Sequence, residues 1–366
     1  MKTVRKLLAT LLLLLLVLVG LVWYLAGTES GLQFAAKMLQ SQFGEALQIG
    51  RLSGRLATVI DVEDLRVQVG DDVYSIRHVH LDWSPRALLS REVRVNQLHA
   101  DSVSVSIAAS GEPGDTDFAI DIALPVAITL EEASISSLTI AGLGEKPIVL
   151  QQLTLSARTE HQQLAIDTLQ LVADSYSAGL AGNLGLQPEQ PSELQLDWHI
   201  DTAGDAPFTA SGQTSISGLL HAYRLQGESS LSGKDIPDGH WQFSAEGNPD
   251  GLSISQLEGQ TLDGSVSASG RLDWSTDFNW QAEVSAGNIN PASIQPSWPG
   301  KLDAKLHSKG RIENGELIAE ADITRLAGSL RGYPVSLRSQ LQWRNAGLDI
   351  EQLKFESGNS SFSAQG

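Results

Sequence analysis

The sequence predicts a mainly β protein in which an N-terminal transmembrane helix and a short capped helix precede an antiparallel-rich region of repeated hairpin units. Three observations lead to this fold class. An apolar run of bilayer length lies near the N-terminus, apolar and polar residues alternate along most of the remaining chain, and one motif occurs three times.

Composition excludes several classes of function. The 366 residues contain 43 acidic and 25 basic side chains, a formal net charge of −18, which argues against binding to a nucleic-acid backbone. The chain contains no cysteine, and this excludes thiolate catalysis, disulfides and cysteine-ligated zinc. The length fits two or three ordinary domains or a single elongated one.

The first element is the apolar run Leu7–Ala26, about 20 residues and therefore ~30 Å long as a helix, which matches a bilayer core. Basic residues occur in the tip formed by residues 1–6, so the positive-inside rule places the N-terminus in the cytoplasm and the bulk of the chain across the membrane. The residues that characterise this predicted anchor are Leu7, Leu16, Trp23, Tyr24 and Ala26.

A cleaved signal peptide is the alternative for the same run. Its apolar part is usually only about 7–15 residues long and ends in small residues at the cleavage site. Trp23 and Tyr24 occupy the positions where small residues are needed, and the run is longer than such peptides require. The sequence therefore favours an anchor that is retained.

Residues 27–44 predict a short helix. Ser30 and Gln33 have the spacing of a capping box, and Gly44 is a stop signal. The predicted apolar face comprises Leu32, Ala35, Leu39 and Phe43.

Residues 45–110 predict an N-terminal β module and residues 111–366 a repetitive β region. Val103, Val105 and Ile107, for example, alternate with small or polar residues, as in a strand with one apolar face. Only the segment Ser84–Ser90 is again helical in character, with Pro85 at its first position. The apolar faces could be buried in a two-sheet sandwich or line an open trough, and periodicity leaves both possibilities open.

The repeated motif is L-x-I-x-x-L, followed by a glycine 18 residues after the first leucine. Its copies occupy residues 164–182, 252–270 and 348–366, so Ile166, Ile254 and Ile350 correspond and are expected to face one apolar interior. A second motif, L-x-W, recurs at Leu81–Trp83, Leu196–Trp198, Leu272–Trp274 and Leu341–Trp343. The last copy stops at Gly366, from which we expect the array to continue in a longer protein.

The chain shows no catalytic signature. His78 and His80 share a strand face, but no third ligand at metal-binding spacing accompanies them. We therefore expect no metal, no cofactor and no enzymatic activity.

Residues 47–107 resemble the N-terminal periplasmic segment of the TamB family, within the wider AsmA-like group. The resemblance rests on I-G-x-x-x-G at Ile49–Gly54, D-L-x-V at Asp64–Val67 and V-x-x-L-x-A-D-x-V-x-V at Val95–Val105. It extends through N-I-N-P at Asn288–Pro291 into the repeats. It implies an elongated, curled, trough-like sheet anchored in the bacterial inner membrane, and a role in outer-membrane protein assembly, secretion and phospholipid transport.

The same resemblance implies three partners: the inner-membrane bilayer, phospholipid acyl chains, and an outer-membrane barrel subunit reached through a C-terminal region outside this sequence. The lining expected for a lipid groove is Val103, Val105, Ile107, Leu196, Trp198, Ile254, Val266, Leu272 and Trp274. The alternative is a structural or adhesive cell-envelope β-array without lipid cargo.

Overall fold

The computed structural model describes residues 27–108, 126–142, 146–160, 162–204, 206–234, 236–313, 316–344 and 347–366. The predicted anchor at residues 7–26 and the basic tip at residues 1–6 lie outside them. Among the described residues, no helix combines the length and apolarity needed to cross a bilayer.

The capped helix is present as α2 (Glu29–Phe43), followed by a short 3₁₀ turn, η1 (Gly44–Ala46). Its N-cap is Thr28, whose side chain accepts a hydrogen bond from Gly31 N, and not Ser30 as the capping-box spacing suggested. Gly44 ends the helix with φ +57°, a conformation that glycine adopts without strain. Leu32 is only 4% exposed, and the helix packs beside β1 (Leu47–Gly54).

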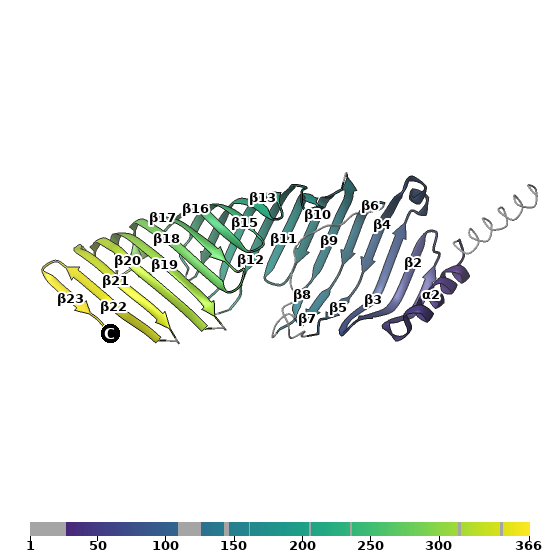
Figure 1. Ribbon diagram of the computed structural model, residues 1–366, viewed down its shortest axis with the longest axis horizontal. Helices are drawn as coiled ribbons and strands as arrows, with labels where there is room; N and C mark the ends of the chain where they lie inside the picture. The colour runs from purple at the N-terminus through teal and green to yellow at the C-terminus, as the bar shows by residue number, and fades with distance from the viewer. Residues whose placement is uncertain are drawn as a thin grey trace, which may run out of the picture. The chain divides into compact units, whose positions relative to one another are not determined.

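The remaining described chain is almost entirely strand, because Val, Ile, Leu, Thr and Trp alternate with polar residues and turn residues separate the runs (Figure 1). It divides into two compact units, the first ending at Asp174 and the second running from Ser175 to Gly366. The further strands of the first unit are β2 (Val59–Val69), β3 (Asp72–Trp83), β4 (Glu92–Ala100), β5 (Val103–Ser106), β6 (Ala127–Ile135), β7 (Leu138–Ala141), β8 (Ile148–Leu150), β9 (Gln152–Glu160) and β10 (Gln163–Val172). A 3₁₀ turn, η2 (Pro85–Ser90), joins β3 to β4, with Pro85 in its first turn as expected.

Strand pairing in the first unit is antiparallel except at one place. β4 runs parallel to β6, and β5 runs parallel to β7. Asp101–Ser102 separates β4 from β5, and Ser136–Ser137 separates β6 from β7. The two interruptions lie side by side, because Ala100 pairs with Ile135 and Val103 with Leu138. On the other side, Val79 of β3 pairs with Ala100 and Ile76 of β3 pairs with Val103, so β3 continues past the break.

The second unit is an antiparallel meander in which each strand pairs with the next. Its strands are β11 (Tyr176–Gly185), β12 (Ser192–Asp201), β13 (Phe208–Leu219), β14 (Ala222–Gly233), β15 (Gly239–Asn248), β16 (Gly251–Thr261), β17 (Gly264–Asp273), β18 (Phe278–Ile289), β19 (Gly300–Glu313), β20 (Glu316–Leu330), β21 (Tyr333–Arg344), β22 (Gly347–Ser357) and β23 (Ser360–Ala364). A 3₁₀ turn, η3 (Pro291–Ser293), follows β18. The β16–β17 turn has positive φ at Leu262 and Asp263, the twist that a tight hairpin requires.

The repeated motif marks a β-bulge. In the second copy Ala245 pairs with Ile254 and Ser244 with Gln256, so Ser255 is an extra residue. The extra residue in the first copy is Asp167, and in the third it is Glu351. One extra residue turns the period of two into three, which is why isoleucine and leucine three apart lie on one face.

The hairpins of the second and third copies are equivalent, as predicted. Gly270 lies opposite Ile254, and Gly366 exchanges two backbone hydrogen bonds with Ile350, at 2.7 and 2.9 Å. The first copy has β10 in one unit and β11 in the other, so its two strands are described separately.

Each unit has a single-layered sheet in place of a sandwich. No large side chain among the described residues is fully buried, and the core residues are scattered alanines, leucines and a few others of low exposure. A packed two-sheet core would instead contain many fully buried large side chains.

Candidate functional site

One face of the second unit is apolar along its whole run of strands. Residues paired across an antiparallel ladder lie on the same face, so the registers connect Leu196 on β12 through each successive strand to Ile350 on β22. We call this surface the apolar face. It includes Leu196, Trp198, Trp241, Phe243, Ile254, Val266, Leu272, Trp280, Val284, Leu306, Ile323, Leu337, Leu341 and Ile350.

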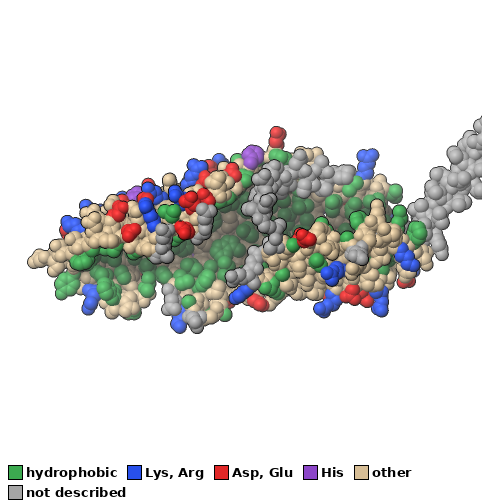
Figure 2. Space-filling view, turned by 60° about the horizontal axis from the view of Figure 1, so that its bottom comes forward, with side chains coloured by type: hydrophobic (Ala, Val, Ile, Leu, Met, Phe, Trp, Pro, Cys, Tyr) green, Lys and Arg blue, Asp and Glu red, His purple; other side chains and the backbone are tan. Residues whose placement is uncertain are grey.

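The charges lie on the opposite, polar face. No Asp, Glu, Lys, Arg or His is among the residues that these registers place on the apolar face between β12 and β22. Across the polar face, Arg224 pairs with Glu246 and Lys309 with Glu320, each at 2.9 Å. In the C-terminal strands, at the left of Figure 2, hydrophobic side chains gather in a hollow below a charged edge.

The apolar face is not covered by other described residues. Leu196, Val266 and Leu272 are half-buried by their neighbours within the sheet. Larger side chains at the strand ends are more open: Trp274 and Phe278 are each 40% exposed. The face therefore remains available to a ligand or partner.

Five of the six predicted groove residues in the second unit lie on one face. Leu196, Trp198, Ile254, Val266 and Leu272 all lie on the apolar face. Trp274 follows the end of β17, where its Nε1 donates a 2.6 Å hydrogen bond to the carbonyl oxygen of Pro249.

The other three predicted residues lie in the first unit. Val103 and Val105 pair with Ile76 and Tyr74 on one side, and with further apolar residues of β7 on the other. Ile107 follows β5, and its backbone N donates to Ala141 O at 2.9 Å. All three are half-buried and share one apolar face of that unit.

Sequence analysis did not identify Trp241, Phe243 and Trp280 as lining residues. Their place depends on the bulges and hairpin registers between them and the recognised motifs. The available signal was their alternation with Gln, Ser and Asn, which marks one face of a strand.

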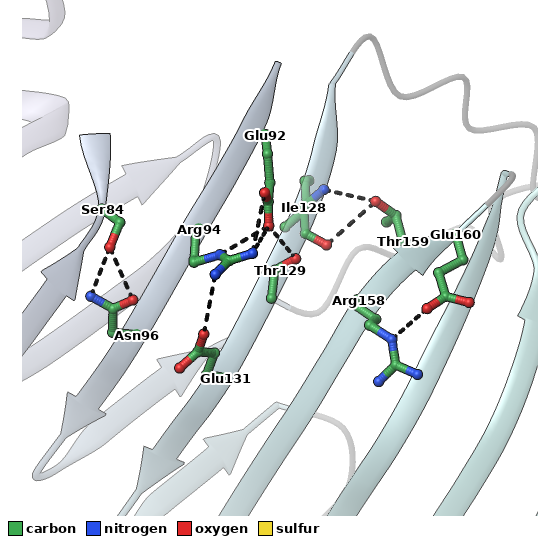
Figure 3. A network of polar contacts seen from close by, with 10 residues as sticks. All are labelled: Ser84, Glu92, Arg94, Asn96, Ile128, Thr129, Glu131, Arg158, Thr159 and Glu160. Atoms are coloured by element: carbon green, nitrogen blue, oxygen red, sulfur yellow. Dashed lines mark hydrogen bonds and ion pairs between the residues drawn. The ribbon is translucent and has the colours of Figure 1, made fainter. Parts of the chain in front are cut away.

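A polar network joins β4 to β6 at the parallel pairing (Figure 3). Thr129 Oγ1 donates to Glu92 Oε1 at 2.8 Å, and Arg94 bonds the same oxygen at 3.0 Å. Arg94 also lies 3.9 Å from Glu131, while Thr159 Oγ1 accepts a 2.7 Å hydrogen bond from Ile128 N. These contacts fix the register of β6 between its two neighbours.

Glu92 should make the stability of the first unit depend on pH. The hydrogen bond from Thr129, assisted by Arg94, lowers the pKa of Glu92 below its ordinary value. Its contribution is therefore present above the ordinary glutamate pKa and is lost as the pH falls through the lowered pKa. We expect Glu92→Gln to lower the urea midpoint at neutral pH, and the difference from the wild type to vanish in acid.

Urea titrations at several pH values check this, with Glu132→Gln, an exposed residue of β6, as the control for the change in net charge. If Glu92→Gln lowered the urea midpoint by the same amount at neutral and acidic pH, the ionised carboxylate of Glu92 would not be the source of the stability.

Two other polar features do not form a ligand site. His78 lies 3.7 Å from Asp61 and 3.3 Å from Asp101, yet no group of His, Asp or Glu in the described residues has the geometry to hold a metal ion. A hollow of about 580 Å³ lies over β17–β22 on the polar face, and charges in its lining, including Lys309 and Glu320, pair with one another.

Comparison with known proteins identifies relatives. The family described as "TamB, N-terminal domain" matches residues 18–170 and 197–366. The translocation and assembly module subunit TamB of Haemophilus influenzae is 24% identical over 281 residues, which cover 74% of this chain and 21% of that protein. The chain thus spans about a fifth of the length of this relative. No solved structure matches the chain.

Proposed function

Because the chain belongs to the family of the TamB N-terminal domain, we propose that it is an anchored periplasmic protein whose apolar face carries phospholipid acyl chains between the two membranes. In this proposal it takes part in outer-membrane protein assembly as a subunit of the translocation and assembly module. Its partners are the inner-membrane bilayer and an outer-membrane barrel subunit, and it performs no covalent chemistry.

The observation that supports this proposal best is the uncharged, uncovered apolar face. Soluble monomers rarely expose contiguous apolar patches larger than a few hundred Å². This face continues over consecutive strands from β12 to β22 with aliphatic or aromatic side chains on each of them. A surface of that extent needs an apolar occupant.

Acyl chains fit such a face better than a polar ligand does. Each methylene group removed from water contributes about 0.8 kcal/mol and needs no directional contact. A headgroup needs charged partners, which the apolar face lacks and the strand ends supply: Asp273 and Arg311 lie near one edge. We therefore place acyl chains along the face and headgroups at its edge.

Purified protein tests the proposal. Mass spectrometry of an organic extract should recover phospholipid in roughly stoichiometric amount from the native protein, and none after unfolding and washing in denaturant. Native protein that carries no phospholipid when extracted directly from membranes would count against lipid transport and in favour of a structural β-array.

The anchor is a second expected outcome. Residues 7–26 are apolar over bilayer length, and Trp23 and Tyr24 stand where an interface prefers aromatic side chains. N-terminal sequencing of membrane-extracted protein should therefore find residues upstream of Leu7. A mature N-terminus near Gly27 or Thr28 would overturn the proposed topology.

A further inference from the structure

Aromatic side chains on the apolar face are paired with glycines. Trp241 lies directly opposite Gly259 in the β15–β16 register, and Tyr223 lies opposite Gly247 in the β14–β15 register. The pairs Trp198 with Gly212, Phe243 with Gly227, and Trp280 with Gly310 are made in the same way.

Each ring occupies the space that a side chain on its partner would need. A Cβ added to Gly259 would lie 2.3 to 2.6 Å from three atoms of the Trp241 ring. At Gly247 the nearest atoms, at 2.5 to 2.6 Å, all belong to the Tyr223 side chain. The rings therefore lie flat on the backbone of the neighbouring strand. Gly259 is itself buried beneath the indole.

We infer that these glycines determine how closely an acyl chain can approach the sheet, because each allows a ring to lie along the sheet and present its outer face to an acyl chain. The inference rests on the function proposed above. It assigns a role in lipid binding to glycines that have no side chain to contact the lipid and act through the rings opposite them. A glycine inside a strand otherwise weakens it and packs nothing, so five aromatic–glycine pairs on one face need a reason. Flat rings provide broad, uncharged contact while leaving room above them.

Any larger residue at such a glycine must lift the ring off the sheet. Valine at position 259 favours the strand conformation, so the backbone tolerates it. Its side chain competes with the indole of Trp241, which must rotate outward into the space used by the ligand. The expected consequence is a narrower groove in a sheet that still forms.

Gly259→Val tests the inference, with phospholipid extracted from purified full-length chain and quantified by mass spectrometry. We expect about fourfold less bound phospholipid, the change that corresponds to one displaced methylene group at about 0.8 kcal/mol. The double variant Gly259→Val with Trp241→Ala removes the obstructing ring and should return binding toward the wild-type amount. Gly179→Val is the matched control, since a Cβ there meets nothing within 4 Å and its position lies on the polar face.

The outcomes distinguish the role of Gly259 from the proposed function of the protein. Wild-type phospholipid in Gly259→Val would overturn the role of the glycine and leave the proposed function intact. Lipid-free wild-type protein would overturn the proposed function itself. A loss that Trp241→Ala does not restore, with a lowered urea midpoint, would show that Gly259 serves only the stability of the sheet.

Discussion

Val266→Asp should reduce the phospholipid recovered with the protein by about tenfold and leave the sheet folded. Val266 lies in the middle of the apolar face on β17, between Gly259 and Ala286, and is only half-buried. A hydrated carboxylate there keeps an acyl chain away. Displacing about two methylene groups costs roughly 1.6 kcal/mol, slightly more than the 1.4 kcal/mol of a tenfold change.

Quantitative lipid extraction and circular dichroism of Val266→Asp check this prediction together. Ser285→Asp adds the same charge on the polar face, opposite Lys305, and should bind lipid as the wild type does. Val105→Arg makes the corresponding change in the first unit. Unchanged lipid in Val266→Asp would contradict a passage along this face, and a collapsed fold would indicate a packed core there.

Deleting Ser267 should severely destabilise the second unit. Ser267 lies inside the ladder of β17 and is paired on both sides, so its loss moves one half of the strand by one position relative to both neighbours. Val266 or Leu272, depending on which half moves, would then turn to the polar face. Each large apolar side chain moved from contact into water costs about 1.5–3 kcal/mol, so we expect a loss of several kcal/mol.

Urea unfolding followed by tryptophan fluorescence measures this effect. Deletion of Ser255 is the control, because Ser255 is the extra residue of the β16 bulge and its loss lets Ile254 and Leu257 keep their partners on both neighbours. This deletion removes the 3.1 Å hydrogen bond from Ser255 Oγ to Ser244 O and should cost far less than the register shift. Equal midpoints for the two deletions would show that the stability of the unit does not depend on the register.

The alternation of side chains was sufficient to predict the strands, because a period of two is a local property. The repeated motif was sufficient to predict that Ile254 and Ile350 correspond. The bulge was not predicted. An isoleucine and a leucine three residues apart do not fit a period of two. Only the register with the neighbouring strand shows that one residue between them is unpaired, so that both lie on one face. A fourth I-x-x-L, Ile323–Leu326 on β20, carries the same kind of bulge outside the three recognised copies.

Other features depended on contacts between distant parts of the chain. The parallel pairing of β4 with β6 joins residues 35 positions apart, such as Glu92 and Ala127, so no local pattern indicates it. Thr28 and Ser30 are both suitable N-caps by residue type, so the local sequence does not choose between them. Periodicity likewise shows that a strand has an apolar face without showing what covers it.

The residues of the candidate site that were predicted are mostly those that belong to a recognisable motif. Leu196, Trp198 and Leu272 were recognised through L-x-W, and the register places them on one face. The glycine partners of the rings have no sequence signal of their own, because a glycine in a strand acquires meaning only from the residue opposite it.

The central claim is that acyl chains occupy the apolar face, and crosslinking from position 266 tests it most directly. A photoreactive amino acid at position 266 should yield phospholipid adducts when cells are irradiated, whereas the same amino acid at position 267, on the polar face, should yield none. Adducts confined to position 266 are the result that the account predicts. A stably folded protein without lipid adducts at position 266, or with equal adducts at both positions, would contradict it.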